Sequence, residues 1–262
     1  MNKLVALFAA LLLAGSGAVA NAGALVDVSV MDRSSGKTLE VYPHRGRLYV
    51  AGTPGNRYTV LLRNHSGGRV LTVLSVDGIN ALNGQTAATS QSGYVLAAGQ
   101  VAEISGWRKS MDDVAAFYFT SVADSYAGRT DRPQNVGVIG VAVYREAEAA
   151  PPPAVAMPSR ERDAPGAAAG AVANAAAKAA APVRDEVATR QIESRLGTGH
   201  GERINAPTQF TEFRRATDSA TEILTLYYDS YANLLAQGII PRPKREPAPN
   251  PFPGGFTPDP RR

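Results

Sequence analysis

The sequence contains no cysteine, one tryptophan and only three histidines among its 262 residues. Without cysteine the chain forms no disulfide and offers no thiolate ligand, so its stability must come from a packed core or from partners. The three histidines, His44, His65 and His200, do not show His-x-x-x-His spacing, and we predict no metal site and no cofactor. The 27 basic and 23 acidic residues form no concentrated basic stripe, which argues against nucleic-acid binding.

The sequence also lacks long apolar runs, with one exception at its N-terminus. Leu4–Leu13 follows Lys3 and precedes small residues at 14–22, which is the pattern of a cleavable secretory signal, cut after Ala20 or Ala22. A run of about ten apolar residues is too short for a membrane-spanning helix, which needs roughly twenty. Because no cysteine follows the run, a lipoprotein anchor is excluded there. We expect a periplasmic or secreted protein whose mature form has no transmembrane segment.

Composition changes along the chain and divides it into five parts. Residues 147–183 contain 17 alanines and 6 prolines, which is typical of a disordered linker. Residues 241–262 are rich in proline and carry five basic against two acidic residues, as expected of a solvated arm. The predicted organisation is a signal peptide (1–22), a β-sandwich domain (23–147), an Ala/Pro-rich disordered linker (148–183), a small α+β module (184–240) and a basic Pro-rich disordered tail (241–262).

The domain at 23–147 has the pattern of β structure. Alternating apolar residues and turn signals predict about nine short strands, and Asp77-Gly78 is a strong hairpin signal between two of them. Val114–Thr120 and Val136–Tyr144 are the most apolar stretches and are predicted as central strands buried on both faces. Many short strands separated by Gly and Pro turns favour a two-sheet β-sandwich of immunoglobulin-like or jelly-roll type.

The C-terminal module at 203–240 allows two interpretations. In the first, 208–217 and 222–228 form a β-hairpin, and a short helix follows at 231–237. In the second, one long amphipathic helix spans 220–237 behind a capping box. The isoleucine, threonine and paired tyrosines favour strand, so the hairpin plus helix is the preferred interpretation.

Three segments carry the candidate binding residues. The loop at 105–110 places an aromatic side chain beside two cations, a combination suited to carbohydrate, anionic lipid or peptide, and the loop at 125–133 adds a tyrosine and two arginines. The glycine-rich segment 197–201 offers a backbone nest and an imidazole. It follows a short helix predicted at 184–196 and so lacks the context of a nucleotide fingerprint. The predicted ligand-binding residues are Trp107, Arg108, Lys109, Tyr126, Arg129, Arg132, Gly199 and His200.

Several segments together resemble a family of uncharacterised exported proteins of Gram-negative bacteria. They are RYTVLLRN, VLTVLSVDGIN, QSGYVL, ISGWRKS, VAAFYFT, SYAGRT and VGVIGVAVYRE in the β domain, and LGTGHGER and YYDSYANLLAQGIIP after the linker. The resemblance covers about 57–146 and 196–241 and implies a periplasmic or envelope location. It implies no activity.

These observations predict an exported, non-enzymatic binding or interaction protein that acts through loops of the sandwich on an unknown protein or envelope ligand. Two alternatives stay open. One is an envelope hydrolase with its active site around His200, although the chain has no Gly-x-Ser-x-Gly elbow. The other is an accessory structural subunit of a cell-envelope assembly.

Overall fold

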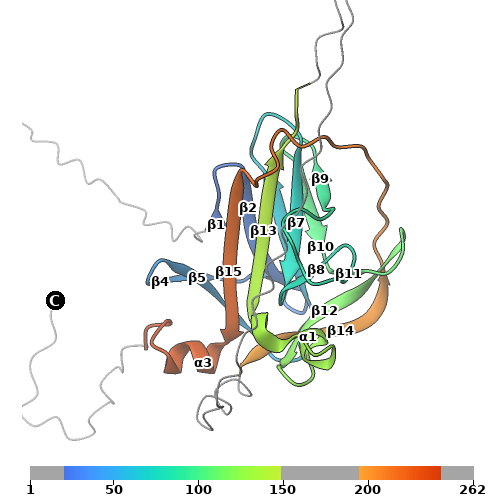
Figure 1. The fold of residues 1–262 in the computed structure, drawn as a ribbon. Helices are drawn as coiled ribbons and strands as arrows, with labels where there is room; N and C mark the ends of the chain where they lie inside the picture. The colour runs from blue at the N-terminus through green and yellow to red at the C-terminus, as the bar shows by residue number, and fades with distance from the viewer. Residues whose placement is uncertain (1–20, 149–194, 243–262) are drawn as a thin grey trace, which may run out of the picture.

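The computed structural model describes residues 21–148 and 195–242, which form a mainly β structure (Figure 1). The apolar run of the predicted signal, nearly all of the predicted linker and most of the predicted tail lie outside these residues. Within the two described ranges, no helix has the length and apolar character needed to cross a bilayer.

Sheet A forms one layer and is built from the N-terminal strands. Its strands follow the order β1-β2-β6-β10, and β3 pairs with one end of β2. The predicted alternation is confirmed in β2, where Val26, Val28 and Val30 are buried and the residues between them are partly exposed. The strands are β1 (Asn21–Ala22), β2 (Val26–Asp32), β3 (Lys37–Thr38), β6 (Tyr58–Asn64) and β10 (Val101–Ile104).

Sheet B faces sheet A and has the order β4-β5-β15-β13-β7-β8, with β9 also paired to β7. Its strands are β4 (Val41–His44), β5 (Arg47–Gly52), β7 (Val70–Val76), β8 (Ile79–Asn80), β9 (Tyr94–Leu96), β13 (Val138–Arg145) and β15 (Glu222–Ser230). The central position predicted for β13 is confirmed, since it pairs antiparallel with both β7 and β15. The Asp77-Gly78 hairpin between β7 and β8 is also confirmed, with φ values of 54° and 75° that suit this turn.

Sheet C has fewer strands and adjoins sheet A. It consists of β11 (Gly106–Arg108), β12 (Asp113–Ser121) and β14 (Leu196–Asn205), with β12 in the predicted central position. The start of β6 joins it, because Arg57 forms a β-bridge with Tyr118 and the N–H of Phe119 donates to the carbonyl of Asn56 at 3.0 Å. Three short helices lie in the described part of the chain: α1 (Tyr126–Arg129), the 3-10 turn η1 (Pro133–Asn135) and α3 (Tyr231–Ala236).

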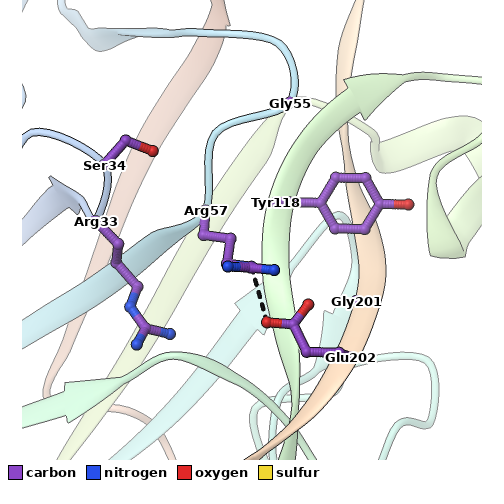
Figure 2. Close-up of a pocket in the computed structure, with 7 residues that line it drawn as sticks. All are labelled: Arg33, Ser34, Gly55, Arg57, Tyr118, Gly201 and Glu202. Carbon is purple, nitrogen blue, oxygen red and sulfur yellow. Dashed lines mark ion pairs between the residues drawn. The ribbon is translucent and has the colours of Figure 1, made fainter.

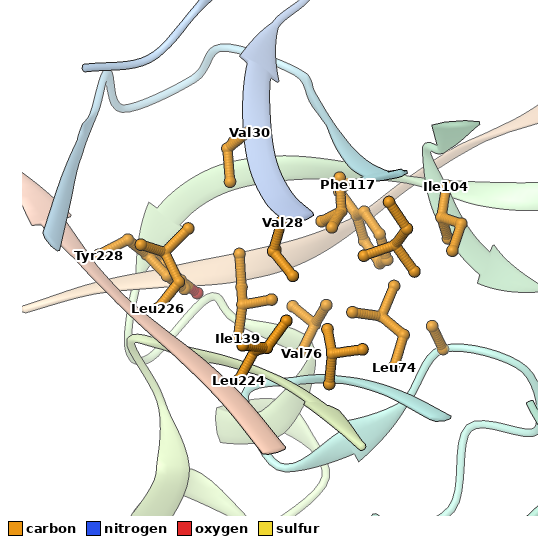
Figure 3. Packing of buried hydrophobic residues seen from close by; sticks show 14 of the residues in the cluster. Val28, Val30, Leu74, Val76, Ile104, Phe117, Ile139, Leu224, Leu226 and Tyr228 are labelled. Atoms are coloured by element: carbon orange, nitrogen blue, oxygen red, sulfur yellow. The ribbon is translucent and has the colours of Figure 1, made fainter. Parts of the chain in front are cut away.

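The main core lies between sheets A and B. Figure 3 shows Val28 of β2 facing Ile139 of β13 and the leucines Leu224 and Leu226 of β15. These side chains are at most 9% exposed, and burying one of this size contributes about 2 kcal/mol. The two facing sheets and their shared apolar core establish the predicted β-sandwich class.

The C-terminal segment differs from the separate module that the sequence suggests. Its strands enter the sheets of the N-terminal part: β14 lies beside β12, and β15 lies between β13 and β5, parallel to β5. Strand β15 and helix α3, which Ser230 caps by accepting from the N–H of Asn233, agree with the preferred interpretation, and the long helix over 220–237 is wrong. Local sequence patterns carry no information on partners this distant in the chain.

Residues 208–217 are not the second strand of a hairpin. They cross the outer face of sheet B, where Phe213 packs against the buried cluster of Leu71, Val73, Ala142 and Tyr144. Arg215 lies 4.0 Å from the ring centroid of Tyr144. Strand β15 already has partners on both sides, so this segment has no free edge of β15 to pair with.

The junction between sheets B and C is polar. The buried carboxylate of Asp77 accepts from the N–H of Thr198 at 2.7 Å and from the N–H of Gly137 at 2.9 Å, and Asp229 accepts from the N–H of Leu196 at 3.1 Å. The two aspartates therefore satisfy edge N–H groups of β14 that would otherwise need a neighbouring strand.

Candidate functional site

Most of the predicted binding residues meet on one surface beside His200. The imidazole lies with its ring centroid 5.2 Å from that of Tyr126 and 6.2 Å from that of Trp107, nearly parallel to the indole at 11°. Tyr126 and Trp107 are themselves 4.9 Å apart. The charges of Lys109 and Arg129 act on the same imidazole. We call these five residues the His200 surface.

Three elements hold the His200 surface in place. The β12–β14 register pairs Phe117 with His200, so both side chains point to the same side of sheet C. Trp107 packs its edge against Phe117 at 4.8 Å and 89°. Tyr126 is fixed by the first turn of α1, where the hydroxyl of Ser125 accepts from the N–H of Gly128 at 2.9 Å.

Trp107 is a core residue, which corrects its prediction as an exposed loop aromatic. It belongs to β11 and is only 2% exposed, and its indole N–H makes no hydrogen bond with any described residue. The polar residues around it suggested a loop, but the short β11–β12 pairing turns the indole inward between Phe117 and Tyr126. Trp107 supports the His200 surface from below.

The His200 surface has an excess of positive charge. Burial lowers the pKa of His200, and the charges of Lys109 and Arg129 lower it further, so the imidazole is neutral at pH 7. Lys109 and Arg129 are exposed, and neither forms an ion pair with a carboxylate in the described part of the chain. Arg132 lies close by, 5.8 Å from the ring centroid of Tyr126, and donates to the hydroxyl of Thr130 at 3.0 Å.

The structure places Arg108 and Gly199 elsewhere. Arg108 donates to the carbonyls of Ala206 and Met111, so its guanidinium ties down the chain after β14. Gly199 lies in an extended strand, where successive N–H groups point to opposite sides, and therefore forms no nest. Its lack of a side chain makes room for Tyr118, since an added Cβ would lie 2.1 Å from the ring.

A second group of residues, which the sequence did not indicate, lines a hollow of about 560 Å³ on the other face of sheet C. Figure 2 shows Arg33, Arg57 and Glu202 around it, with Tyr118 beside them. We call this hollow the Tyr118 trough; it is lined by Arg33, Ser34, Gly55, Arg57, Tyr118, Gly201 and Glu202. The only signal in the sequence is the alternation of glycines at 197, 199 and 201, which is typical of a strand that another group approaches closely.

No protein-family model, curated protein or solved structure matches this chain. The resemblance to exported Gram-negative proteins therefore stays a prediction, and the geometry of the two surfaces carries the functional argument.

Proposed function

We propose that this chain is an exported, non-enzymatic binding protein that holds an anionic ligand on the His200 surface. The observation that carries the proposal is the pair of exposed cations, Lys109 and Arg129, beside a neutral imidazole and without a carboxylate partner among the described residues. Such cations are available to an external anion, and the partly exposed ring of Tyr126 beside them offers apolar contact area.

The hydrolase alternative gains no support from the surroundings of His200. Within the described ranges, the contacts of the imidazole are with the rings of Trp107 and Tyr126, and no Ser, Thr, Asp or Glu side chain hydrogen-bonds to it. A nucleophile–base pair requires such a bond. A role as an accessory subunit of an envelope assembly is compatible with an anion-binding surface and stays a prediction.

Export is the second part of the proposal and rests on the N-terminal signal pattern. The first described strand begins at Asn21, which pairs with Val28 of β2. Cleavage after Ala20 leaves β1 complete, whereas cleavage after Ala22 removes it. We therefore expect the mature chain to begin at Asn21, and N-terminal sequencing of the processed protein tests this.

Ligand binding is tested with a fluorescent deca-glutamate peptide as the anionic probe and the chain from Asn21 to Arg262. We expect binding that weakens as salt is raised, because the interaction is between exposed charges. Replacing Lys109 and Arg129 together by glutamine should weaken binding about tenfold, which corresponds to about 1.4 kcal/mol. Fluorescence anisotropy measures both effects.

The matched control replaces Lys37 and Arg45 by glutamine, which removes the same charge from two exposed positions elsewhere. The control variant should bind as the unmodified chain does. Equal weakening in both double variants would show that only net charge matters, and the proposal would be wrong. Turnover of ester, glycoside or peptide substrates that is lost in His200→Ala would instead favour the hydrolase.

A further inference from the structure

We infer that the Tyr118 trough is a second binding site, and that its ligand is an acidic saccharide chain. This site is separate from the His200 surface, because Tyr118 points to the face of sheet C opposite to Phe117 and His200. The argument rests on the side chains that four neighbouring segments bring together.

The trough is built by a row of residues across adjoining strands. The N–H of Arg33 donates to the carbonyl of Arg57 at 2.8 Å. The backbone of Arg57 forms a β-bridge with that of Tyr118, and Tyr118 pairs with Gly199 in the β12–β14 register. The backbone pairing therefore places Arg33, Arg57 and Tyr118 in one row, and Figure 2 shows their side chains among those that line the hollow.

The ring of Tyr118 is a flat platform. An added Cβ would lie 2.1 Å from it at Gly199 and 3.3 Å from it at Gly201, so the ring lies directly on the backbone of β14. Its side chain is partly exposed and makes no hydrogen bond within the described residues. A flat aromatic surface of this kind packs against the C–H face of a sugar ring through dispersion and weak C–H contacts.

The polar groups around the ring are both donors and acceptors. Arg33, Ser34 and Arg57 supply N–H and O–H groups, and Glu202 supplies a carboxylate that accepts from hydroxyl groups. A simple anion such as phosphate would meet repulsion from Glu202, whereas a ligand with many hydroxyl groups uses both kinds of partner. Arg33 has no ion pair among the described residues and is free for a carboxylate of the ligand.

The existing ion pair does not block the site. Arg57 and Glu202 are 2.8 Å apart, but their side chains are 55% and 46% exposed, and such pairs contribute about 0–1 kcal/mol. Exchanging this pair for hydrogen bonds to a ligand therefore costs little. The hollow of about 560 Å³ is within the usual size range of ligand sites, and its open form suits a stretch of a longer chain.

The test uses the chain from Asn21 to Arg262, tetragalacturonate as the acidic probe and maltotetraose as the neutral probe. In ¹⁵N-correlated NMR spectra, the acidic probe should shift the amide signals of Gly55 and Gly201 in a saturable way. The neutral probe should bind about tenfold more weakly, because it lacks the carboxylate for Arg33. Arg33→Gln should remove this preference, and Tyr118→Ala should weaken binding of both probes by about tenfold or more.

Two further variants keep the outcome decisive. Tyr118→Phe retains the flat aromatic ring and should bind both probes as the unmodified chain does. If circular dichroism shows that Tyr118→Ala does not fold, Tyr118→Phe serves as the reference, and Arg33→Gln alone decides the test. The Lys109→Gln/Arg129→Gln variant should bind tetragalacturonate normally, which separates this site from the proposed function. Three results would each overturn the inference: loss of binding in that variant, unchanged binding in Arg33→Gln, or no shift of the amide signals. The last applies at about 10 mM probe, a concentration at which even a complex with a Kd of about 1 mM is largely formed.

Discussion

The two junctions that hold the sheets together differ in chemistry. Between sheets A and B the contact is apolar, with valines of β2 packed against Ile139 and Leu226. Between sheets B and C, Phe119 packs against Tyr228, and a chain of buried hydrogen bonds that begins at Tyr58 of sheet A is added to this contact. The hydroxyl of Tyr58 lies 2.6 Å from that of Thr198, which lies 2.6 Å from that of Tyr228, and Tyr228 donates to Asp77 at 2.5 Å.

The apolar junction supplies most of the driving force, and the polar junction fixes one arrangement. Apolar contacts have no direction, so many packings of sheets A and B give similar energies. The hydroxyl of Tyr58 has one partner in the chain, and those of Thr198 and Tyr228 have two each. Burial raises the pKa of Tyr58 and Tyr228 well above the ordinary value, so both phenols stay protonated. A displaced β14 would leave several buried polar groups without partners, which costs about 1–3 kcal/mol for each. The polar junction thus fixes where β14 carries His200 and Gly199.

The largest effect is expected from a change in the apolar junction. Leu226→Ala removes a side chain that is 1% exposed from the centre of β15. We expect the free energy of unfolding to fall by about 4 kcal/mol, from lost burial and the cavity that remains. Chemical denaturation measures the loss, which should be equal at pH 4.5 and pH 7. A loss that changed with pH would show that the two junctions are not independent.

The polar junction should make stability depend on pH through Asp77. Burial is the main cause that raises the pKa of this carboxyl from 3.8 to about 6, against the effect of its hydrogen bonds from Tyr228, Thr198, Gly137 and Val138. The folded chain therefore keeps a proton that the unfolded chain has released, and stability falls as pH rises from about 4 to about 6. Asp77 contributes about 3 kcal/mol to this fall in the free energy of unfolding, and the fall is complete above that pH range.

The measurement compares Asp77→Asn with the unmodified chain across this pH range. The asparagine has no carboxyl proton to lose, so the stability difference between the two proteins should change by about 3 kcal/mol from pH 4 to pH 7 in favour of the variant. Asp112→Asn, at an exposed position, is the control and should follow the unmodified chain. Parallel curves for Asp77→Asn and the unmodified chain would contradict the shifted pKa.

The sequence predicted the elements of the apolar junction well, for a local reason. The alternation of Val26, Val28 and Val30 in β2 and the apolar run of β13 are properties of single strands, and both predictions are confirmed. The polar junction was not predictable in this way, because Asp77 and Thr198 are 121 residues apart and no periodicity links them. Asp77 was recognised only as a turn residue.

The same contrast holds for the candidate site. The cations and aromatic rings of two loops were identified from their residue types, and the structure brings Lys109, Tyr126, Arg129 and His200 together. The burial of Trp107 and the Tyr118 trough depend on the β12–β14 register, and that register follows from where β14 is anchored. The chemistry that a side chain offers can be read from one segment, whereas the face of the sheet on which it lies depends on pairing with distant strands.

The smallest effects are expected from the two phenols of the polar chain, and they distinguish its two ends. Tyr228→Phe and Tyr58→Phe each remove one buried hydroxyl, and each should lower the free energy of unfolding by about 1–2 kcal/mol at pH 7.

Only Tyr228 bonds directly to Asp77, and its hydrogen bond lowers the pKa of that carboxyl. Tyr228→Phe should therefore raise the pKa of Asp77 and move the pH-dependent loss of stability to higher pH. Tyr58→Phe should leave its position unchanged, because Tyr58 hydrogen-bonds to Thr198 and not to the carboxylate. Denaturation at pH steps between 4 and 8 measures both profiles, and an equal displacement in the two variants would mean that the chain titrates as one unit.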